Sequence, residues 1–506
     1  MKETRWAILA AAALVAVVAG RRIQIKKQQG SLPPGPRSLP LIGNVLDMNW
    51  QQPWVTFADW SREHGDLVYS RLFGLGIVTL HSEKSIRDLL DKRSYKYSDR
   101  VALVTVEPYG TEFNTPTIRY GDTWRFHRRL YHQVFHQEAA TVYRPMQTRK
   151  AHELMVNLLS HPSEFHEHMH AFGAAVVMSA VYDYDVKPND PIIRTVIEAV
   201  EKMVGAPEKS ALVAAFPFLK YVPPSLPGGN FNAAICREYC KKMIEEPYQY
   251  MIRKMQADEG MTSMGADCLR RFGEEGDVEQ MIKDACGTAF SAGSDTTASV
   301  LIVFILAMTL YPDIQARAQK EVDAVVGDDR LPTYEDRDSL PFLDALIRET
   351  LRWGPVTPLA VWHATSEDDI YNGYFIPKGT AIVANVWALS RDPIKYPSPE
   401  TFNPDRFLTP TGELTEDEFR YPFGFGRRIC PGMHLADASL WIAVASMLSL
   451  FNFAKTKDAQ GRDVEPNATW TSGVVIAPKA FPCSVTPRNP SITRVKLDEL
   501  IKEAQH

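Results

Sequence analysis

The segment at residues 423–432 reads FGFGRRICPG and decides the interpretation of the whole chain. Three glycines flank a single cysteine, Cys430, so the backbone can bend tightly and approach a flat object closely. Pro431 stands where a first helical residue is common, which predicts that Cys430 caps a helix over residues 431–452. A thiol at a helix N-terminus has a lowered pKa and readily forms a thiolate. A lone thiolate in a glycine-rich turn suits the axial ligand of a haem iron.

This segment resembles the cysteine loop of the cytochrome P-450 family, F-G-x-G-x-R-x-C-x-G, and meets every fixed position. The resemblance implies that Cys430 ligates the iron of haem b and that Phe423, Gly424 and Gly432 contact this cofactor. Arg428, two residues before the cysteine, matches a position that binds a haem propionate. The alternative is a buried structural cysteine in a tight turn.

A second motif lies inside a long apolar stretch. Residues 292–297 read AGSDTT and resemble the oxygen-activating segment of the same family. Asp295 and Thr296 place an acid beside an alcohol within a helix predicted over residues 279–310, where neither residue favours a helix. The resemblance implies that the pair relays protons to dioxygen. The alternative is a kinked helix in which Thr296 bonds its own backbone.

Two more segments follow in the family's order and imply a structural ion-pair group. Glu349 and Arg352 match the family's E-x-x-R and share one helix face. The sequence FNPDRF at 402–407 supplies Arg406, with Asp405 where glutamate is commoner. The resemblance implies that Glu349, Arg352 and Arg406 lock the loop that carries the cysteine. Taken alone, a Glu/Arg pair at this spacing is usually solvated surface.

Haem propionates need cationic or polar partners, and three further residues match family positions for this task. Trp124 and Arg128 are spaced i, i+4 and share a helix face, as in the family's W-x-x-x-R. His363 falls where the family uses arginine or histidine. Arg125 and Arg129 lie on an adjacent stripe and either face a redox partner or are simply solvated.

The N-terminus carries an apolar run of 15 residues from Trp6 to Gly20. As a helix it spans roughly 22 Å, and flanking arginines can extend its reach towards the ~30 Å of a bilayer core. The excess of basic residues after the run, beginning at Arg21 and Arg22, predicts a single-pass anchor whose C-terminal side faces the cytosol. A cleaved secretory signal is the alternative. A cytosolic domain would leave the sequon at Asn467 without sugar.

The remaining chain has globular proportions. Of its 506 residues 45% are apolar and 23% charged, and the net charge of −5 predicts no broad nucleic-acid surface. Helical periodicity dominates, and short strand-like pieces such as 381–383 suggest a small sheet. The sequence therefore predicts a mostly α fold with a small β part, in one large cytochrome P-450 domain behind an anchor helix.

The predicted boundaries follow from composition. No Gly/Ser-rich linker, repeat or charge block divides residues 50–490. Further helices are predicted at 313–326 and 341–353. The domain boundaries are an anchor with its basic flank at 1–30, the haem domain at 31–490 including a proline-rich hinge at 31–43, and a tail at 491–506.

The resemblance implies a monooxygenase that inserts one atom of dioxygen into a substrate and needs two electrons from outside, because the chain shows no dinucleotide or flavin domain. The implied donors are an NADPH-dependent diflavin reductase on the same membrane, the endoplasmic reticulum, and cytochrome b5. Residues 384–392 resemble fungal members that oxidise secondary metabolites or foreign aromatics.

The substrate interpretation rests on apolar segments that would line the pocket by family analogy. They favour an apolar small molecule such as a terpenoid, a polyketide or a polycyclic aromatic. The apolar stretch 216–227 either dips into lipid or packs as an ordinary loop. The competing functions are a haem-thiolate isomerase or dehydratase, a non-catalytic haem protein, and a membrane scaffold without haem. The pocket segments are 101–118, 211–231, 290–296, 356–362 and 472–477.

Overall fold

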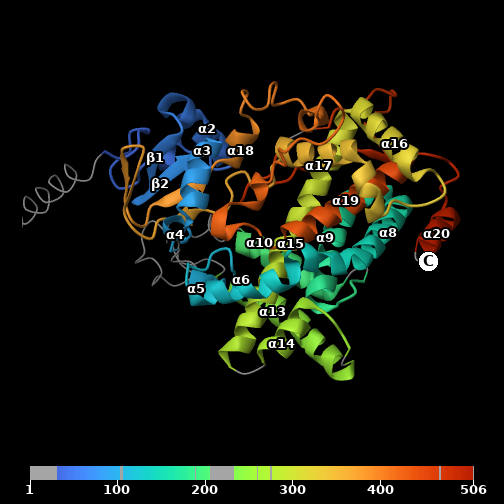
Figure 1. The fold of residues 1–506 in the computed structure, drawn as a ribbon, viewed down its shortest axis with the longest axis horizontal. Coiled ribbons are helices and arrows are strands. Elements are labelled where there is room, and N and C mark those ends of the chain that lie inside the picture. The colour runs from blue at the N-terminus through green and yellow to red at the C-terminus, as the bar shows by residue number, and fades with distance from the viewer. Residues whose placement is uncertain are drawn as a thin grey trace, which may run out of the picture.

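Helices make up most of the computed structural model, and the first two strands, Leu67–Leu72 and Leu75–Leu80, lie at one side (Figure 1). The structure describes residues 31–102, 106–187, 190–204, 233–258, 260–273, 276–466 and 469–504. The predicted fold class, mostly α with a small β part, is confirmed. The anchor predicted at 6–20, the stretch at 216–227 and Asn467 lie outside the described residues.

The longer helices occupy the centre and one side of the molecule, and short helical turns connect them (Figure 1). The longer helices are α2 (Pro53–His64), α6 (Asp122–Phe135), α8 (Arg144–Ser160), α9 (Phe165–Tyr182), α10 (Pro191–Val204), α13 (Ala233–Ala257), α14 (Met264–Phe272), α15 (Asp277–Leu310), α16 (Pro312–Val326), α17 (Pro341–Trp353), α19 (Met433–Leu450) and α20 (Arg494–Glu503). The short α-helices are α3 (Glu83–Ile86), α4 (Ser94–Tyr97), α5 (Val106–Tyr109), α7 (Gln137–Ala140) and α18 (Val386–Ser390). Other helical turns are η1 (Val45–Asp47), η2 (Arg87–Lys92), η3 (Thr141–Tyr143), η4 (Pro162–Glu164), η6 (Tyr334–Ser339), η7 (Pro404–Phe407), η8 (Tyr421–Phe423) and η9 (Gly426–Arg428).

The largest sheet has four strands in the order β1-β2-β6-β3. Its β1–β2 hairpin is antiparallel, β2 pairs in parallel with β6, and β3 closes the sheet antiparallel to β6. The strand predicted at 381–383 is confirmed as β6. The strands are β1 (Leu67–Leu72), β2 (Leu75–Leu80), β3 (His363–Ala364) and β6 (Ala381–Ala384) in this sheet, and the pairs β4 (Asp369–Tyr371) with β5 (Tyr374–Ile376) and β7 (Phe451–Ala454) with β8 (Ser484–Pro487).

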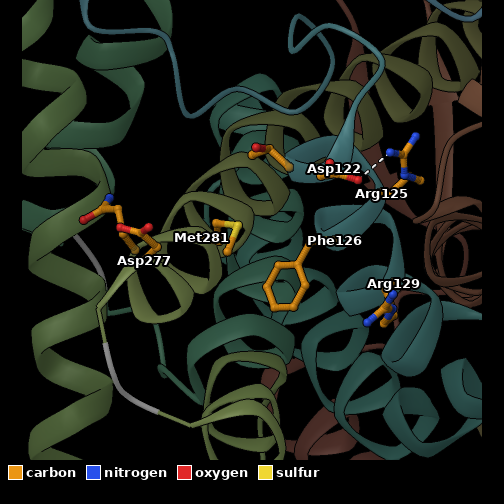
Figure 2. Close-up of a pocket in the computed structure, with 8 residues that line it drawn as sticks. Asp122, Arg125, Phe126, Arg129, Asp277 and Met281 are labelled. Carbon is orange, nitrogen blue, oxygen red and sulfur yellow. Dashed lines mark hydrogen bonds and ion pairs between the residues drawn. The ribbon is translucent and has the colours of Figure 1, made fainter.

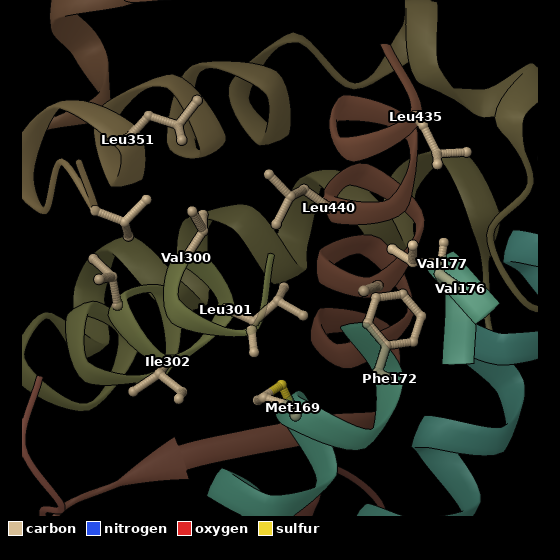
Figure 3. Close-up of a cluster of buried hydrophobic side chains, with 14 of the residues drawn as sticks. Met169, Phe172, Val176, Val177, Val300, Leu301, Ile302, Leu351, Leu435 and Leu440 are labelled. Carbon is tan, nitrogen blue, oxygen red and sulfur yellow. The ribbon is translucent and has the colours of Figure 1, made fainter. Parts of the chain in front are cut away.

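Helix α15 forms the axis of the core. Its 34 residues span about 51 Å, and every residue from 297 to 309 is buried. Val300 and Leu301 of α15 lie near Leu440 of α19 and near Met169 and Phe172 of α9 (Figure 3). This helix is apolar on nearly all sides because other helices cover it, as its sequence predicts.

Two helices are long and apolar enough to cross a membrane by composition alone. These are α15 and α19, and 72% and 78% of their most apolar windows are buried inside the protein. Since a membrane span would present this surface to lipid, both are core helices of the domain. This comparison covers only the residues that the structure describes.

The sequence predicts the helices around the core closely, with one correction. The helix predicted at 341–353 matches α17, and those predicted at 279–310 and 313–326 begin two and one residues late. The prediction that Cys430 caps the next helix is wrong, because α19 begins at Met433 with Gly432 as its N-cap. The Cys430 N–H instead donates to the carbonyl of Phe423, which places the cysteine inside the preceding loop.

Candidate functional site

The cysteine loop is held by its own backbone and by η2. The Cys430 N–H donates to the Phe423 carbonyl at 2.7 Å, which closes the loop. Gly426 has φ +56°, and a Cβ there would lie 1.9 Å from the Leu90 carbonyl oxygen, so only glycine fits. The Gly426 N–H donates to Asp91 Oδ1 at 2.7 Å. The loop is therefore clamped at a point where no side chain can be added.

The Cys430 thiol is unpaired and lies deep in the protein. Burial raises its pKa, against the lowering predicted from a helix cap, while the backbone N–H of Gly432 and the charge of Arg128 oppose this rise. The residue nevertheless keeps partly accessible surface. A metal ion that binds this sulfur would displace its proton outright.

Two predicted cofactor residues converge beside the loop. Arg128 on α6 donates to the Ile429 carbonyl, one residue before the cysteine. The Arg428 guanidinium lies 4.4 Å from the ring centroid of Trp124, also on α6, and its Nε donates to the Ser98 carbonyl at 2.8 Å. Trp124 and Arg128 thus both lie beside the cysteine loop, and their i, i+4 spacing places them on one face of α6.

A further arginine lies in this group that sequence reasoning missed. Arg100 is buried and donates to the carbonyls of Pro116 and Val361, both at 2.7 Å. His363, which the sequence predicts to bind a propionate, lies on β3. It is 4% exposed, and its Nδ1 lies 2.7 Å from the Tyr97 carbonyl. The proximity of Arg100 and of Arg428 lowers the His363 pKa further below its usual range than burial alone. Arg100 follows an Asp at the end of a helical segment, which gives no sequence signal by itself.

In the described part of the chain, the cations of this group form no hydrogen bond to a carboxylate. The hydrogen bonds of Arg100, Arg128 and Arg428 all end on backbone carbonyls. The nearby carboxylate of Asp99 hydrogen-bonds to Arg119, and its charge offsets only part of the effect of burial on the pKa values of Arg100 and Arg428. Burial pushes the Arg100 pKa well below its usual value and lowers that of Arg428 to about 10. A dianionic ligand would remove this cost, since buried charges without partners are strongly unfavourable.

The predicted acid–alcohol pair lies on a partly exposed stretch of α15. Beyond the first turns of the helix, this is the only stretch that the rest of the protein does not cover closely. Ala292 is exposed, and Gly293 to Thr296 are half-buried, between buried residues on both sides. The Thr296 hydroxyl donates to the Ala292 carbonyl at 2.9 Å, so the backbone bond weighed as the alternative forms within a continuous helix. A hydroxyl that donates keeps its lone pairs free to accept another proton donor.

Helix α9 crosses α15 directly at this stretch. A Cβ on Gly173 would lie 2.2 Å from the Ser294 carbonyl oxygen, one residue before Asp295. A Cβ on Gly293 would meet the end of the Val177 side chain at 2.8 Å. Backbone contact between the two helices therefore fixes the position of Asp295 and Thr296.

The predicted structural ion-pair group forms away from the cation group. Arg352 binds both carboxylate oxygens of Glu349 at 2.6 and 2.7 Å, and neither side chain is exposed. Arg406 Nε lies 3.4 Å from Glu349 Oε1, and the Asn403 N–H donates to the same oxygen at 2.7 Å. Arg352 also donates to the Ser390 carbonyl at 2.6 Å. The group ties α17 to the segments on either side of residue 400.

The surface has a hollow of about 650 Å³ between α6 and the start of α15. In Figure 2, Arg125 is joined to Asp122, Phe126 and Met281 point into the hollow, and Arg129 lies at its edge. Arg125 and Arg129 are exposed, whereas Arg128 on the same helix turns towards the cysteine loop. This hollow is therefore separate from the cysteine site.

Comparison with known proteins agrees with this arrangement. The family model named Cytochrome P-450 matches residues 33–483. The chain belongs to the cytochrome P-450 family. The match covers most of the chain and includes the cysteine loop, the cation group and the α15 motif of this P-450.

Curated relatives cover nearly the whole P-450 chain. Cytochrome P-450 monooxygenase 98 of Postia placenta is 38% identical over 92% of this chain and 92% of its own length. Cytochrome P-450 monooxygenase COX2 of Coprinopsis cinerea is 35% identical over 96% and 94%. Cytochrome P-450 monooxygenase claR of Ampulloclitocybe clavipes is 36% identical over 92% and 88%.

Family membership settles the chemistry at a coarse level. The protein is a haem-thiolate monooxygenase that uses dioxygen, a redox partner and a small-molecule substrate. The buried cation group fits the two carboxylates of a haem, and an unpaired, deeply placed thiol fits its iron. The residues present therefore match the implied cofactor.

Proposed function

We propose that Cys430 is the axial ligand of the haem iron in a membrane-anchored monooxygenase. The observation that carries this assignment is the group of buried cations around the loop, because their hydrogen bonds end on backbone carbonyls and Asp99 offsets only part of the cost of their burial. We assign Trp124, Arg128 and Arg428 as the residues that bind the two haem propionates, with His363 beside them. The propionates would supply the negative charges that the arginines lack. Arg100 joins them as a residue that the sequence did not single out.

Cys483, the other cysteine that keeps partly accessible surface, does not have these surroundings. Cys483 borders β8, and its sulfur lies 3.2 Å from the Thr309 hydroxyl at the far end of α15. The groups that influence its pKa are burial, Thr309 and the backbone of Ala454, and no cation is among them. Cys430, in contrast, receives both a backbone N–H and the field of Arg128.

We assign contact with the macrocycle to the loop residues Phe423, Gly424 and Gly432. Gly424 has φ +81°, a conformation that glycine adopts without strain. Glu349, Arg352 and Arg406 keep a structural role, since they hold the segment before the loop and do not approach the cysteine.

When bound, haem supplies the oxygen-splitting and oxygen-transfer chemistry, favoured by its thiolate ligand. The protein must deliver protons and exclude other reactions. Thr296 accepts a hydrogen bond on its free lone pairs while it donates to Ala292, and Asp295 holds a carboxylate one residue away. This pair is the proposed proton relay to the oxygen-binding side of α15.

We further propose that electrons come from an NADPH-dependent diflavin reductase, with cytochrome b5 as a second donor. The exposed Arg125 and Arg129 give α6 a basic edge for an acidic partner (Figure 2). This edge lies on the same helix that contacts the cysteine loop through Arg128.

The proposed substrate is an apolar small molecule, such as a fungal terpenoid or polyketide, or a foreign polycyclic aromatic. In the described pocket segments, Val356, Leu359 and Ile476 are buried apolar side chains, and Phe290 lies on α15. The proposed location is the endoplasmic reticulum membrane, with an anchor at 1–30, the haem domain at 31–490 and a tail at 491–506.

The ligand assignment is tested by comparing Cys430→Ala with Cys483→Ala after expression with ample haem precursor. We expect Cys430→Ala to lose the thiolate-type spectrum of the reduced carbonyl complex and Cys483→Ala to keep it. An unchanged spectrum in Cys430→Ala would refute the assignment. A colourless wild-type protein would refute the haem function itself.

A further inference from the structure

A second, smaller cavity lies on the α9 side of the acid–alcohol pair. Its volume of about 230 Å³ is several times the ~30 Å³ share of one water molecule. Helix α9, the middle of α15 and the segment at 471–480 line it. Its polar side chains are His166, His170, Asp295, Ser299, Thr471 and Lys479.

One of these side chains touches the acid of the proposed relay. His170 Nδ1 lies 3.3 Å from Asp295 Oδ1, and the two side chains are 42% and 40% exposed. His170 is one turn before Gly173, where the two helix backbones meet, so the tight crossing holds this pair in register. His166 lines the same cavity one turn earlier, but no contact joins it to Asp295 in the described residues.

We propose that His170 carries protons from water in this cavity to Asp295, and that the cavity is the proton entrance of the enzyme. This inference rests on the proposed role of Asp295 and Thr296 and names the step that precedes it. One proton from cavity water binds His170 Nε2 while the proton on Nδ1 passes to Asp295, so one proton enters and one leaves. Exchange of the ring tautomer resets the imidazole, and no electron is transferred.

The geometry favours a transfer role over a purely structural ion pair. Both side chains keep about two-fifths of their surface open, whereas Glu349 and Arg352 have none. An imidazole has two nitrogens, so one can receive a proton while the other donates one, and His170 Nδ1 lies 3.3 Å from Asp295 Oδ1. The close crossing of α9 over α15 at Gly173 leaves the adjoining cavity as the route by which water reaches Asp295.

The test uses the full-length haem-loaded protein with its reductase. His170→Gln keeps a polar side chain but cannot pass a proton between two nitrogens. The control is His161→Gln, at an exposed histidine that does not line the cavity. We expect His170→Gln to lower the NADPH-driven turnover rate about tenfold, less than the ~10²-fold loss of a whole general acid because water substitutes in part. Peroxide released per NADPH should rise about twofold or more, and His161→Gln should change neither.

A readout independent of turnover is hydrogen exchange at the imidazole C2 position of each histidine, measured by mass spectrometry. His170 should exchange readily, whereas the buried His127 should not. Ala480→Leu places extra carbons in the cavity away from both partners. It should slow exchange at His170 and raise peroxide release together.

The outcomes separate this inference from the proposed relay. Slower exchange with unchanged peroxide release in Ala480→Leu would overturn the entrance, as would unchanged turnover and coupling in His170→Gln. A rise in peroxide with Thr296→Ala but not with His170→Gln would leave the relay standing and refute the role of His170. No rise with Thr296→Ala would refute the relay itself.

Discussion

The closest approach between α9 and α15 gives a prediction whose size follows from the structure. In Gly173→Ala the new Cβ would lie 2.2 Å from the Ser294 carbonyl oxygen. Ordinary carbon–oxygen contacts are about 3.3 Å or longer, so the helices must separate locally by about 1 Å. A gap of this size forfeits a quarter to a half of the dispersion energy of each contact that it opens.

The expected cost combines two terms of opposite sign. Overpacking of a tight core costs about 1–3 kcal/mol, while alanine favours a helix over glycine by up to about 1 kcal/mol. The net loss of stability is about 1–2 kcal/mol. For a domain of about 450 residues the entropy of unfolding is close to 1 kcal/mol/K, so the Tm should fall by about 1–2 °C.

Coupling is the second readout, because the displaced carbonyl belongs to the residue before Asp295. We expect Gly173→Ala to raise peroxide release per NADPH in the reductase-coupled enzyme. Gly287→Ala is the matched control on α15, since the nearest atoms to its Cβ belong to the Ile244 side chain, with Cγ1 at 2.9 Å, and none is a backbone atom. A Gly173→Ala protein with wild-type Tm and wild-type coupling would refute the claim that this crossing positions the relay.

Four shorter predictions follow from other groups. Glu349→Gln should lower the free energy of unfolding by about 3–5 kcal/mol, because it leaves Arg352 buried without a carboxylate. Asp405→Asn, at an exposed ion pair with Arg317, should lower it by less than about 1 kcal/mol. Equal losses in the two variants would contradict this ranking. Burial lowers the His152 pKa to about 4, below the ~6.5 of the unfolded chain, so this group stabilises the fold above pH 6.5 and the stability is lost as the pH falls towards 4. In denaturant titrations, His152→Leu should therefore reduce the difference in the free energy of unfolding between pH 7 and pH 5, by up to about 1.4 kcal/mol per pH unit. An unchanged difference would contradict the assignment of His152 as a neutral buried histidine. Arg100→Met should speed haem transfer to an acceptor apoprotein several-fold, with exposed Arg125→Met as the unaffected control. Mass spectrometry of the protein from eukaryotic membranes should find no sugar on Asn467, and its presence would overturn the proposed topology.

Much of the fold and part of the site could be predicted because the signals are local in sequence. The boundaries of α17 follow from Pro341 at its start and from apolar periodicity up to Trp353. The placement of Trp124 and Arg128 on one face follows from their spacing on one helix, whereas their approach to the cysteine loop depends on how α6 packs. The contact of Arg352 with Glu349 follows in the same way.

The features that escaped prediction depend on which distant segments meet. Arg100 reaches the carbonyls of Pro116 and Val361, and neither segment is marked by its own sequence. The contact of His170 with Asp295 depends on which helix crosses α15 and at what point. The start of α19 was placed two residues early because Pro431 favours a helix start locally, whereas closure of the loop onto Phe423 decides the outcome.

Backbone contacts at glycines position both halves of the site. Gly173 places α9 against the α15 carbonyl at Ser294, and Gly426 places the cysteine loop against the Leu90 carbonyl. A contact between two backbones does not depend on the size or rotamer of neighbouring side chains, so the surrounding core can change while the relay and the thiolate keep their places. The two glycines, more than the apolar core around them, are the positions where substitution should separate stability from coupling.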